Sequence, residues 1–466
     1  MSTQYDVIII GAGPAGIFAA SELIRKKPDW RVLILEKGND IQNRYCPMHD
    51  KHIPCIHCKN CSITSGWGGA GAYSDGKLTL TTEYGGWLGD FIGTKALEEI
   101  IGQVDDTYVQ YGGNSKVYGM DQDKIKAIQR QAATADLRLI PAKIRHLGTD
   151  KNYEILTNLR KALGSLVEVR TETTVEQLLV QDHQINGVVL CDGTEITARY
   201  VIAAPGREGH EWFSEEAKRL HLPTTNNQVD IGVRVEVPAV VMSDLTDAIY
   251  ESKFIYYSHS FDDQVRTFCM NPYGEVVMEN TRGLITVNGH SYADKRTENT
   301  NFALLVAKTF TQPFNEPITY GKNIAALANM LGDGVIVQRL GDLQSGRRST
   351  EERIKRGLVT PSLPEATPGD LSLVLPYRHL VDIMEMLEAL DKVAPGVNSR
   401  HTLLYGVEAK FYSNRMQVSN ELETQIHNLF AVGDGAGITR GLVQASASGL
   451  IAARAIVERD EKNLSP

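Results

Sequence analysis

The sequence of 466 residues predicts an α/β protein with a parallel-sheet domain built from both ends of the chain and an α+β domain inserted between them. Two stretches support this prediction. Near the N-terminus, an apolar run at 7–10 leads into closely spaced glycines and a helical pattern. Near the C-terminus, the apolar run 429–432 leads into Gly433-Asp434 and a second helical pattern from 442 to 458. Strands that end in glycine and pass into helices are typical of parallel α/β sheets.

The first stretch, residues 6–16, is a strand followed by G-x-G-x-x-G. Gly11 permits the tight turn, Gly13 lets the backbone approach a pyrophosphate, and Gly16 lets the helix pack closely on the strand. A second apolar strand delivers Glu36, whose carboxylate can accept both hydroxyls of a ribose. This spacing predicts a Rossmann-type dinucleotide site without distinguishing NAD from FAD. We expect it to contain Gly11, Gly13, Pro14, Ala15, Gly16, Glu36 and Lys37.

The second stretch resembles the late Gly-Asp element of the glutathione-reductase-type FAD fold. In that family the aspartate lies on the ribityl chain of FAD, and the next helix points its N-terminus at the flavin pyrimidine. Asp434 matches the aspartate, and residues 441–443 match the start of the helix. The buried strand 200–206 matches a second contact with the dinucleotide. The resemblance therefore implies FAD as the cofactor, with further contacts from Val175, Ala204, Gly206, Gly433, Asp434, Gly441, Leu442 and Val443.

The middle of the chain reads as a separate domain. Residues 229–237 alternate apolar and polar side chains, which predicts a half-buried strand with one apolar face. We expect the FAD-binding domain to comprise 1–209 and 401–466, including the Cys- and Gly-rich segment 44–78. The inserted substrate or cap domain is then 210–400.

Four cysteines lie within 16 residues, with a C-x-x-C-x-x-C run at 55–61. Two-residue gaps let successive thiolates converge on one metal. The spacing resembles [4Fe–4S] ligation more than a zinc finger, with zinc as the alternative. Redox-active thiols or simply buried cysteines are the other interpretations. The metal hypothesis names Cys46, Cys55, Cys58 and Cys61.

A glycine-rich stretch, 65–78, follows this cluster. Glycine at this density lets backbone N–H groups crowd a planar ligand or an anion. Trp67, Tyr73 and Leu78 are poor linker residues, so we expect an ordered segment. In the FAD fold this segment passes beside the isoalloxazine, which adds Gly69, Ala70, Ser74 and Lys77 to the expected cofactor contacts.

Most of the chain resembles the uncharacterised bacterial and archaeal FAD-dependent dehydrogenases. One departure is visible at 269–274, Cys-Met-Asn-Pro-Tyr-Gly, where relatives tend to carry Cys-x-Cys-Pro-Gly-Gly. A dithiol mechanism through Cys269 is therefore not expected. The stretches that carry the resemblance are 44–47, the three-cysteine run, 68–77, 145–149, 232–236, 288–291, 369–371 and 405–408.

The resemblance implies an FAD-dependent oxidoreductase. The sequence contains no second G-x-G-x-x-G in a strand–helix context, so we expect no dedicated NAD(P)H domain. We expect a dehydrogenase or reductase that reduces or forms a C=C bond in a small organic substrate, with NAD(P)H or a one-electron carrier as donor. The alternatives are a flavin/iron–sulfur electron-transfer or redox-sensing protein with a protein partner, and a flavin monooxygenase. The sequence assigns no catalytic residue; the candidate proton donors are Tyr73, Lys77, His290 and Tyr405.

Composition bounds the remaining classes. The formal net charge of −9 argues against nucleic acid as a partner. No apolar stretch reaches membrane-spanning length, and no signal peptide is apparent, so we expect no membrane partner and a cytoplasmic protein. Cysteines in that compartment should be thiols or metal ligands. The sequence leaves the oligomeric state open.

Overall fold

The computed structural model describes residues 4–47, 56, 58, 60–74, 76–225, 227–281, 283–292, 296–308, 310, 317–412 and 414–464. The chain divides into two compact units. Unit 1 comprises 1–115, 145–227 and 413–466, and unit 2 comprises 116–144 and 228–412. The sequence prediction placed the boundaries at 209/210 and 400/401 and assigned 116–144 to the first domain. The chain thus crosses between the units four times rather than twice.

Unit 1 is built on a seven-stranded sheet of order β6-β2-β1-β9-β8-β7, with β21 also paired to β9. Strands β6, β2, β1, β9 and β21 pair in parallel, while β7, β8 and the start of β9 form an antiparallel extension. The strands are β1 (Tyr5–Ile10), β2 (Val32–Leu35), β6 (Val167–Arg170), β7 (Val175–Gln181), β8 (Gln184–Leu190), β9 (Glu195–Ala203) and β21 (Leu429–Ala431).

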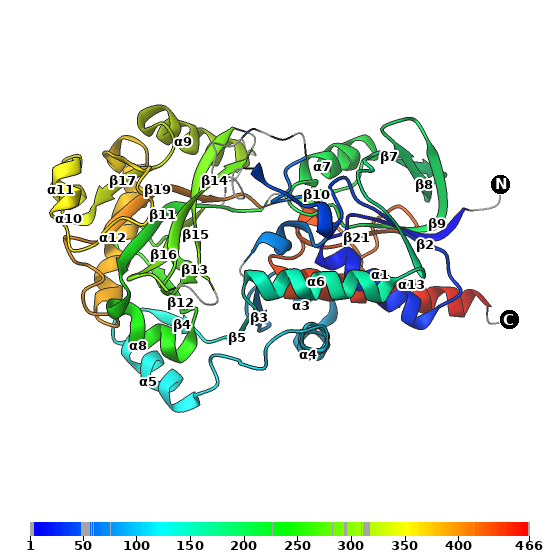
Figure 1. Cartoon of the computed structure of the whole chain (residues 1–466), viewed down its shortest axis with the longest axis horizontal. Coiled ribbons are helices and arrows are strands. Elements are labelled where there is room, and N and C mark those ends of the chain that lie inside the picture. Colours follow the sequence, from blue (N-terminus) through cyan, green and yellow to red (C-terminus); the bar gives the residue numbers. More distant parts are fainter. Residues whose placement is uncertain are drawn as a thin grey trace. The chain divides into compact units, whose positions relative to one another are not determined.

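Both ends of the chain meet in this unit. Helix α1 (Pro14–Lys26) follows β1, and helix α13 (Leu442–Leu464) follows β21. The two helices lie side by side in Figure 1, α1 in blue and α13 in red. They approach so closely that a Cβ built on Gly449 would lie 2.0 Å from the carbonyl oxygen of Ala15. A glycine on α13 is therefore what allows the two helices to pack.

The remaining elements of unit 1 connect or cover this sheet, and β5 lies at the boundary of the two units. They are η1 (Ile41–Asn43), η2 (Gly69–Tyr73), β3 (Lys77–Leu80), α3 (Leu88–Ile92), α4 (Thr94–Gln110), β5 (Lys143–His146), α6 (Thr149–Leu163), α7 (His210–Arg219), β10 (Thr224–Thr225), β20 (Arg415–Met416) and η4 (Asp434–Ala436).

Unit 2 contains an eight-stranded sheet of order β18-β17-β19-β11-β16-β13-β12-β4 and a separate hairpin of β14 and β15. The strands are β4 (Arg138–Ile140), β11 (Val229–Pro238), β12 (Lys253–Tyr257), β13 (Gln264–Asn271), β14 (Glu275–Thr281), β15 (Leu284–His290), β16 (Asn299–Lys308), β17 (Ile336–Arg339), β18 (Thr367–Pro368) and β19 (Leu403–Lys410). The helices are α5 (Gln122–Ala133), α8 (Ala239–Ile249), α9 (Pro317–Gly332), α10 (Leu340–Gln344), α11 (Glu351–Lys355), η3 (Leu371–Leu373) and α12 (Tyr377–Asp391).

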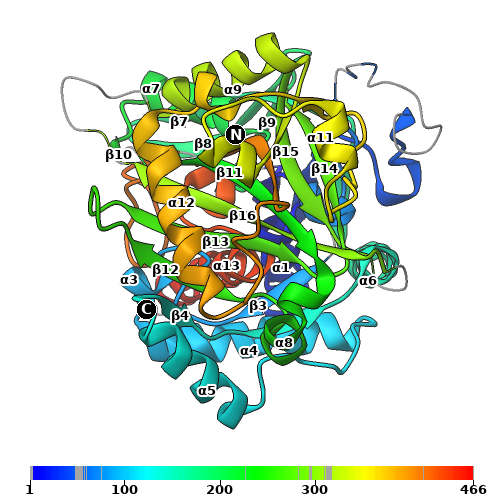
Figure 2. The same ribbon diagram turned by 90° about the vertical axis from the view of Figure 1, so that its left-hand side faces the viewer.

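The central strand β11 corrects one sequence prediction. Its apolar residues enter a core that includes side chains of α8, α9 and α12, and Figure 2 shows α12 crossing this sheet. The polar residues of the opposite face, expected to meet solvent, are fully buried instead: Asp230, Arg234 and Glu236 are each 0% exposed. They are buried because β13 and β19 of the same sheet supply charged and hydrogen-bonding partners, and because β15 also packs there.

These two units confirm the predicted fold class, a Rossmann-type α/β domain with an inserted α+β domain. In the part of the chain that the structure describes, no helix is both long enough and apolar enough to cross a bilayer.

Candidate dinucleotide-binding site

The loop between β1 and α1 is fixed by close backbone approaches. Gly11 has φ +104°, and a Cβ there would lie 2.2 Å from the carbonyl oxygen of Ala204. A Cβ on Gly16 would lie 2.0 Å from the Gly11 oxygen. By contrast, the nearest atom to a Cβ on Gly13 is the Gly69 Cα at 4.0 Å. The loop therefore requires glycine at 11 and 16 for its own shape, while Gly13 faces the glycine-rich segment.

Helix α1 begins without a side-chain cap at Gly13 and with Pro14 in its first turn. The first N–H groups of a helix have no partner inside the helix, and the helix dipole makes this end positive. Ala15 and Gly16 lie in this first turn. This end of α1 is suited to bind the phosphates of a nucleotide.

Glu36 lies at the end of β2 and is 6% exposed. Its Oε2 accepts from the backbone N–H of Ala12 at 2.8 Å, and its Oε1 accepts from Gly38 at 2.8 Å and Gly66 at 2.9 Å. A carboxylate offers about four acceptor positions, so about one remains for a ribose hydroxyl. Glu36 therefore holds the β1–α1 turn and the glycine-rich segment together in addition to its expected role.

The glycine-rich segment, 65–78, lies against the N-termini of α1 and α13. The N–H of Gly68 donates to Ala12 O at 2.7 Å. A Cβ on Gly69 would lie 3.1 Å from the Gly13 Cα, and one on Gly71 would lie 2.5 Å from Leu442 Cδ2. Gly69 and Ala70 belong to η2. The structure thus brings these predicted residues beside the first turn of α1 and the first residue of α13.

Two other predicted residues close this segment. Ser74 Oγ donates to Gly71 O at 2.7 Å and accepts from the N–H of Gly76 at 3.2 Å, so its hydroxyl shapes the end of η2. Lys77 is the first residue of β3.

Arg44 organises the same segment, a role that the sequence analysis did not assign. Its guanidinium is buried and donates all five N–H bonds to backbone carbonyls of Ser62, Ile63, Trp67 and Gly69. It also lies 5.1 Å from the centroid of the Tyr73 ring. Burial lowers the pKa of Arg44 to about 10. Its only signal in the sequence was a place in a family motif, because carbonyl partners leave no side-chain pattern.

Asp434 comes from the other end of the chain. Its Oδ1 accepts from Thr439 Oγ1 at 2.7 Å and from the Gly441 N–H at 3.2 Å. Burial raises the pKa of Asp434, and the guanidinium of Arg207, 3.9 Å from Oδ2, acts in the opposite direction. A Cβ on Gly433 would lie 3.2 Å from the Ala15 Cβ. Asp434 therefore follows directly on a residue that touches α1.

The end of β9 lies between these two elements. The N–H of Ala204 donates to Ile10 O at 2.9 Å, and Gly206 has φ +63° with no atom within 4 Å of a Cβ built there. A Cβ on Gly435 would lie 2.4 Å from Gly206 O. The predicted residues of β1, β9 and the late Gly-Asp element thus form one group at the carboxyl ends of parallel strands, where α/β sheets bind ligands.

Two further predicted cofactor contacts, Val175 and Lys37, lie near Glu36. The N–H of Thr173 donates to Glu36 O at 2.9 Å, and Val175 opens β7 two residues later with a buried side chain. Lys37 Nζ lies 3.7 Å from Glu208 Oε1. Val175 and Lys37 therefore lie beside Glu36, and Lys37 already has an acidic partner.

The start of α13 is covered by a strap, residues 84–87, that the sequence analysis missed. The N–H of Trp87 donates to Ile438 O at 3.0 Å, and that of Arg440 donates to Gly85 O at 2.7 Å. Gly441 has φ +114° and open space around it, while Val443 is buried. The two glycines at 85 and 86 were the available signal.

The metal hypothesis falls partly outside the described residues, because Cys55 is not among them. Cys58 and Cys61 are free thiols, and Cys46 is half-buried. Over the part of the chain that the structure describes, no group of three or more His, Cys, Asp or Glu side chains could hold a metal ion. The four-cysteine site stays a prediction, and nothing below depends on it.

The candidate proton donors mainly contact protein groups. Tyr73 OH donates to Arg44 O at 3.2 Å, and Tyr405 OH donates to Glu236 Oε2 at 2.6 Å. Burial, followed by the Glu236 carboxylate, raises the pKa of Tyr405 well above its ordinary value. The His290 ring meets Tyr292 edge-on at 4.8 Å between centroids. We assign no catalytic residue.

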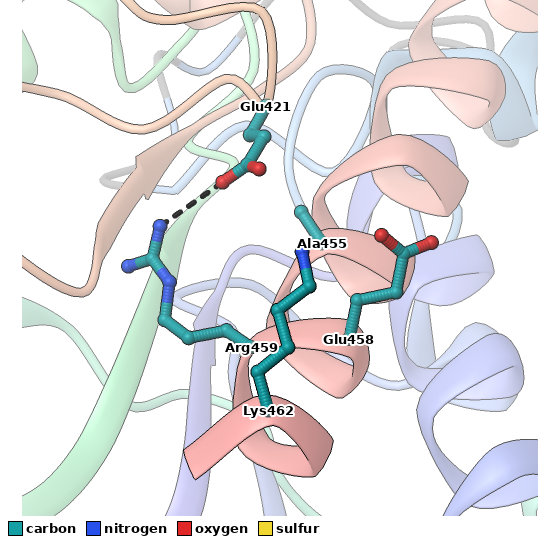
Figure 3. Close-up of a pocket in the computed structure, with 5 residues that line it drawn as sticks. All are labelled: Glu421, Ala455, Glu458, Arg459 and Lys462. Carbon is teal, nitrogen blue, oxygen red and sulfur yellow. Dashed lines mark hydrogen bonds and ion pairs between the residues drawn. The ribbon is translucent and has the colours of Figure 1, made fainter.

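A separate pocket in unit 1 is lined by Glu421, Ala455, Glu458, Arg459 and Lys462 (Figure 3). Arg459 Nη2 lies 3.0 Å from Glu421 Oε2, and Nη1 is paired with Glu423. The lining holds two acidic and two basic side chains. It contains none of the predicted site residues and is not the candidate site.

Three family models match parts of the chain. Residues 228–411 match the model described as FAD-dependent protein, C-terminal domain-like. Residues 6–143 match the lycopene cyclase protein model, and 362–463 match the glucose inhibited division protein A model. A protein of Clostridium beijerinckii, described as an uncharacterized protein, is 26% identical over an alignment of 479 residues. The alignment covers 97% of this chain and 80% of that protein.

Solved structures similar to the chain have low sequence identity. A formate oxidase has a TM-score of 0.47 at 11% identity, with 99% of each chain covered. L-proline dehydrogenase from P. horikoshii has a TM-score of 0.41 at 12% identity, with 98% of this chain and 95% of that chain covered. Glycine oxidase from Bacillus cereus has a TM-score of 0.38 at 14% identity, with 99% and 97% covered. By the family comparison, residues 228–411 of this chain are similar to the C-terminal domain of FAD-dependent proteins.

Proposed function

We propose that this protein is an FAD-dependent oxidoreductase that binds the cofactor in unit 1. The observation that carries the proposal is the meeting of two distant elements: the glycine loop that opens α1 and the Gly433-Asp434 turn. A Cβ built on Gly433 would lie 3.2 Å from the Ala15 Cβ. The match of 228–411 to a model for FAD-dependent proteins adds independent support.

The donor and acceptor set fits FAD. In our proposal the N–H groups at the start of α1 bind the pyrophosphate, because that helix end is positive and lacks a side-chain cap. Glu36 accepts from the adenosine ribose with its remaining acceptor position, and Asp434 accepts from the ribityl hydroxyls. The N-terminus of α13 faces the pyrimidine of the isoalloxazine.

The flavin, when bound, supplies the hydride or electron transfer. The chain's contribution is to bind and orient it: Arg44 fixes the carbonyls of the glycine-rich segment, and Glu36 fixes that segment to the β1–α1 turn. The Glu36–Gly66 hydrogen bond is buried, and the Arg44–Gly69 hydrogen bond is partly buried. We further propose a small organic substrate, with NAD(P)H or a one-electron carrier as the donor.

An absorbance spectrum of anaerobically purified protein, with iron and zinc assayed on the same sample, tests the proposal. We expect flavin bands, or their appearance when apoprotein is titrated with FAD. Reduction by NAD(P)H would then identify a direct donor, whereas roughly four irons per chain would point to the one-electron alternative. Absence of flavin both after gentle purification and after FAD titration would overturn the proposal.

A further inference from the structure

The turn after β9, residues 205–209, lies beside the glycine loop of the proposed cofactor site. The N–H of Ala204, the residue before this turn, donates to Ile10 O at 2.9 Å. A Cβ on Gly11 would lie 2.2 Å from Ala204 O. The turn itself is closed by the N–H of Gly209, which donates to Pro205 O at 3.1 Å. It is therefore found at the same end of the sheet as the β1–α1 loop.

Two adjacent side chains of this turn reach different predicted cofactor contacts. Arg207 Nε lies 3.9 Å from Asp434 Oδ2, and Glu208 Oε1 lies 3.7 Å from Lys37 Nζ. In the proposed function, Asp434 accepts from the ribityl chain, whereas Lys37 follows the residue that accepts from the adenosine ribose. The diphosphate of FAD joins these two parts of the cofactor. The turn therefore lies where that diphosphate is expected.

The side chain of Arg207 is accessible and weakly held. It is 62% exposed, and the Asp434 side chain beside it is 20% exposed, so a ligand can reach both. Their separation of 3.9 Å is close to the limit of an ion pair. No atom lies within 4 Å of a Cβ built on Gly206, the residue before Arg207. The guanidinium therefore has room to take another partner.

The charge of the proposed site calls for a cation at this position. The diphosphate of FAD brings two negative charges to a site that already holds the carboxylates of Glu36 and Asp434. The start of α1 supplies only about half an elementary positive charge. Lys37 already has an acidic partner, and the Arg440 guanidinium lies over an indole ring. Arg207 is the accessible cation beside the site whose present partner, Asp434, is itself a proposed cofactor contact.

We propose that Arg207 is a binding residue for the cofactor, and that its guanidinium donates to oxygens of the FAD diphosphate in addition to the N–H groups at the start of α1. The inference rests on the proposed function and deepens it. A guanidinium presents paired N–H donors that match two phosphate oxygens. Because the side chain is exposed, it can turn from Asp434 to the diphosphate without disturbing any helix or strand. Asp434 then accepts from the ribityl hydroxyls.

The test titrates apoprotein with FAD and follows flavin fluorescence at low and high KCl concentrations. We expect Arg207→Met to bind FAD about tenfold more weakly than the wild-type protein at low salt. The dissociation constant of this variant should also depend less on KCl, because salt screens the lost contact between a cation and a phosphate. Arg207→Lys keeps the charge without the paired donors, so its affinity should lie between the two.

Arg25→Met is the matched control. The Arg25 side chain is 59% exposed and lies near the other end of α1, about 15 Å along the helix from its start. Its partner Glu22 keeps a second guanidinium, that of Arg454, at 2.8 Å. We expect this variant to keep both the FAD affinity and the salt dependence of the wild-type protein.

A double-variant cycle separates a contact with the diphosphate from a role limited to pairing with Asp434. In an Asp434→Asn background the ion pair is absent, and Arg207→Met should still weaken FAD binding by about the same factor. An effect of Arg207→Met that disappears in this background, or that leaves the salt dependence unchanged, overturns the inference. So does an FAD affinity equal to that of Arg25→Met. These outcomes leave the proposed function intact, whereas failure of the wild-type protein to bind FAD overturns the proposed function itself.

Discussion

The two units bury acidic side chains in different ways. In unit 1, Glu36 is held by three backbone N–H groups from separate loops. In unit 2, Glu408 is 0% exposed and is held by the guanidinium of Arg234 at 2.7 Å and by Lys410 Nζ at 3.0 Å. Backbone donors leave an acceptor position for a ligand, whereas the ion pair between strands satisfies itself. The comparison shows that Glu36 keeps an acceptor position, as the proposed function requires, whereas Glu408 is paired within its own sheet.

The largest effect is expected from breaking the Arg234–Glu408 ion pair of unit 2. Arg234→Met leaves Glu408 buried beside Lys410 alone and should cost about 3–5 kcal/mol in the free energy of unfolding of unit 2. The double variant Arg234→Met/Glu408→Met should recover part of this loss, because the unpaired Glu408 carboxylate is removed, while Lys410 loses its Glu408 partner. Urea denaturation followed by circular dichroism measures both.

A matched surface pair controls this experiment. Lys355 and Glu351 are both more than 70% exposed and are 3.3 Å apart. Lys355→Met should therefore cost less than about 1 kcal/mol. A loss for Arg234→Met as small as that for Lys355→Met would contradict a stabilising role for the polar face.

The second largest effect is expected from a substitution that deforms the β1–α1 turn of unit 1. Gly11→Ala places a Cβ 2.2 Å from Ala204 O in a left-handed backbone, and should cost about 3 kcal/mol and abolish FAD binding. Gly193→Ala is the control, since Gly193 also has positive φ but open space around it. It should cost about 1 kcal/mol and leave FAD binding unchanged. Calorimetry and FAD titration separate the two, and equal FAD binding by both variants would show that the loop does not line the cofactor site.

The third substitution tests whether Glu36 holds the glycine-rich segment, apart from its proposed role in accepting from a ribose hydroxyl. Glu36→Gln removes the charge and one acceptor group, so some of the three N–H donors lose their partner; we expect a cost of about 2 kcal/mol. Hydrogen exchange at the amides of Gly38 and Gly66 should become faster, while exchange in β11 stays unchanged. Unchanged exchange at Gly66 would mean that the carboxylate does not hold the glycine-rich segment.

The smallest expected effect is a pH dependence within unit 2. Burial, together with the neighbouring Asp263 carboxylate, raises the pKa of Asp382 to about 6 from an ordinary 3.8. Because the folded chain holds this proton more tightly, Asp382 contributes most to stability below about pH 4, and the contribution is lost as the pH rises through about 6. Relative to Asp382→Asn, the wild-type protein should lose about 1–2 kcal/mol between pH 4 and pH 7.

Chemical denaturation of both proteins across this range measures the difference. The comparison with Asp382→Asn cancels the nearby His379, whose pKa burial lowers to about 4. A constant difference from pH 4 to pH 7 would contradict the raised pKa.

The sequence by itself determined the elements whose shape depends on neighbouring residues. The turn after β1, the helix that follows and the acidic residue at the end of β2 are local features, because the strand, glycine and helix patterns of residues 6–36 specify them. The joining of both chain ends in one sheet was also predictable, since each end carries a strand that stops in glycine and continues as a helix. These features gave the fold class and most residues of the candidate site.

Only the tertiary structure decided which polar groups are buried and what pairs with them. Arg234 and Glu408 are 174 residues apart in the sequence, and Gln444 and Tyr84 are 360 apart. An alternating strand such as β11 therefore looks half-exposed until its partners are known. Arg44 bonds to carbonyls, which every residue possesses, so no pattern of side chains could reveal its role. The physical reason is that burial of a polar group is favourable only where a distant segment supplies its hydrogen bonds.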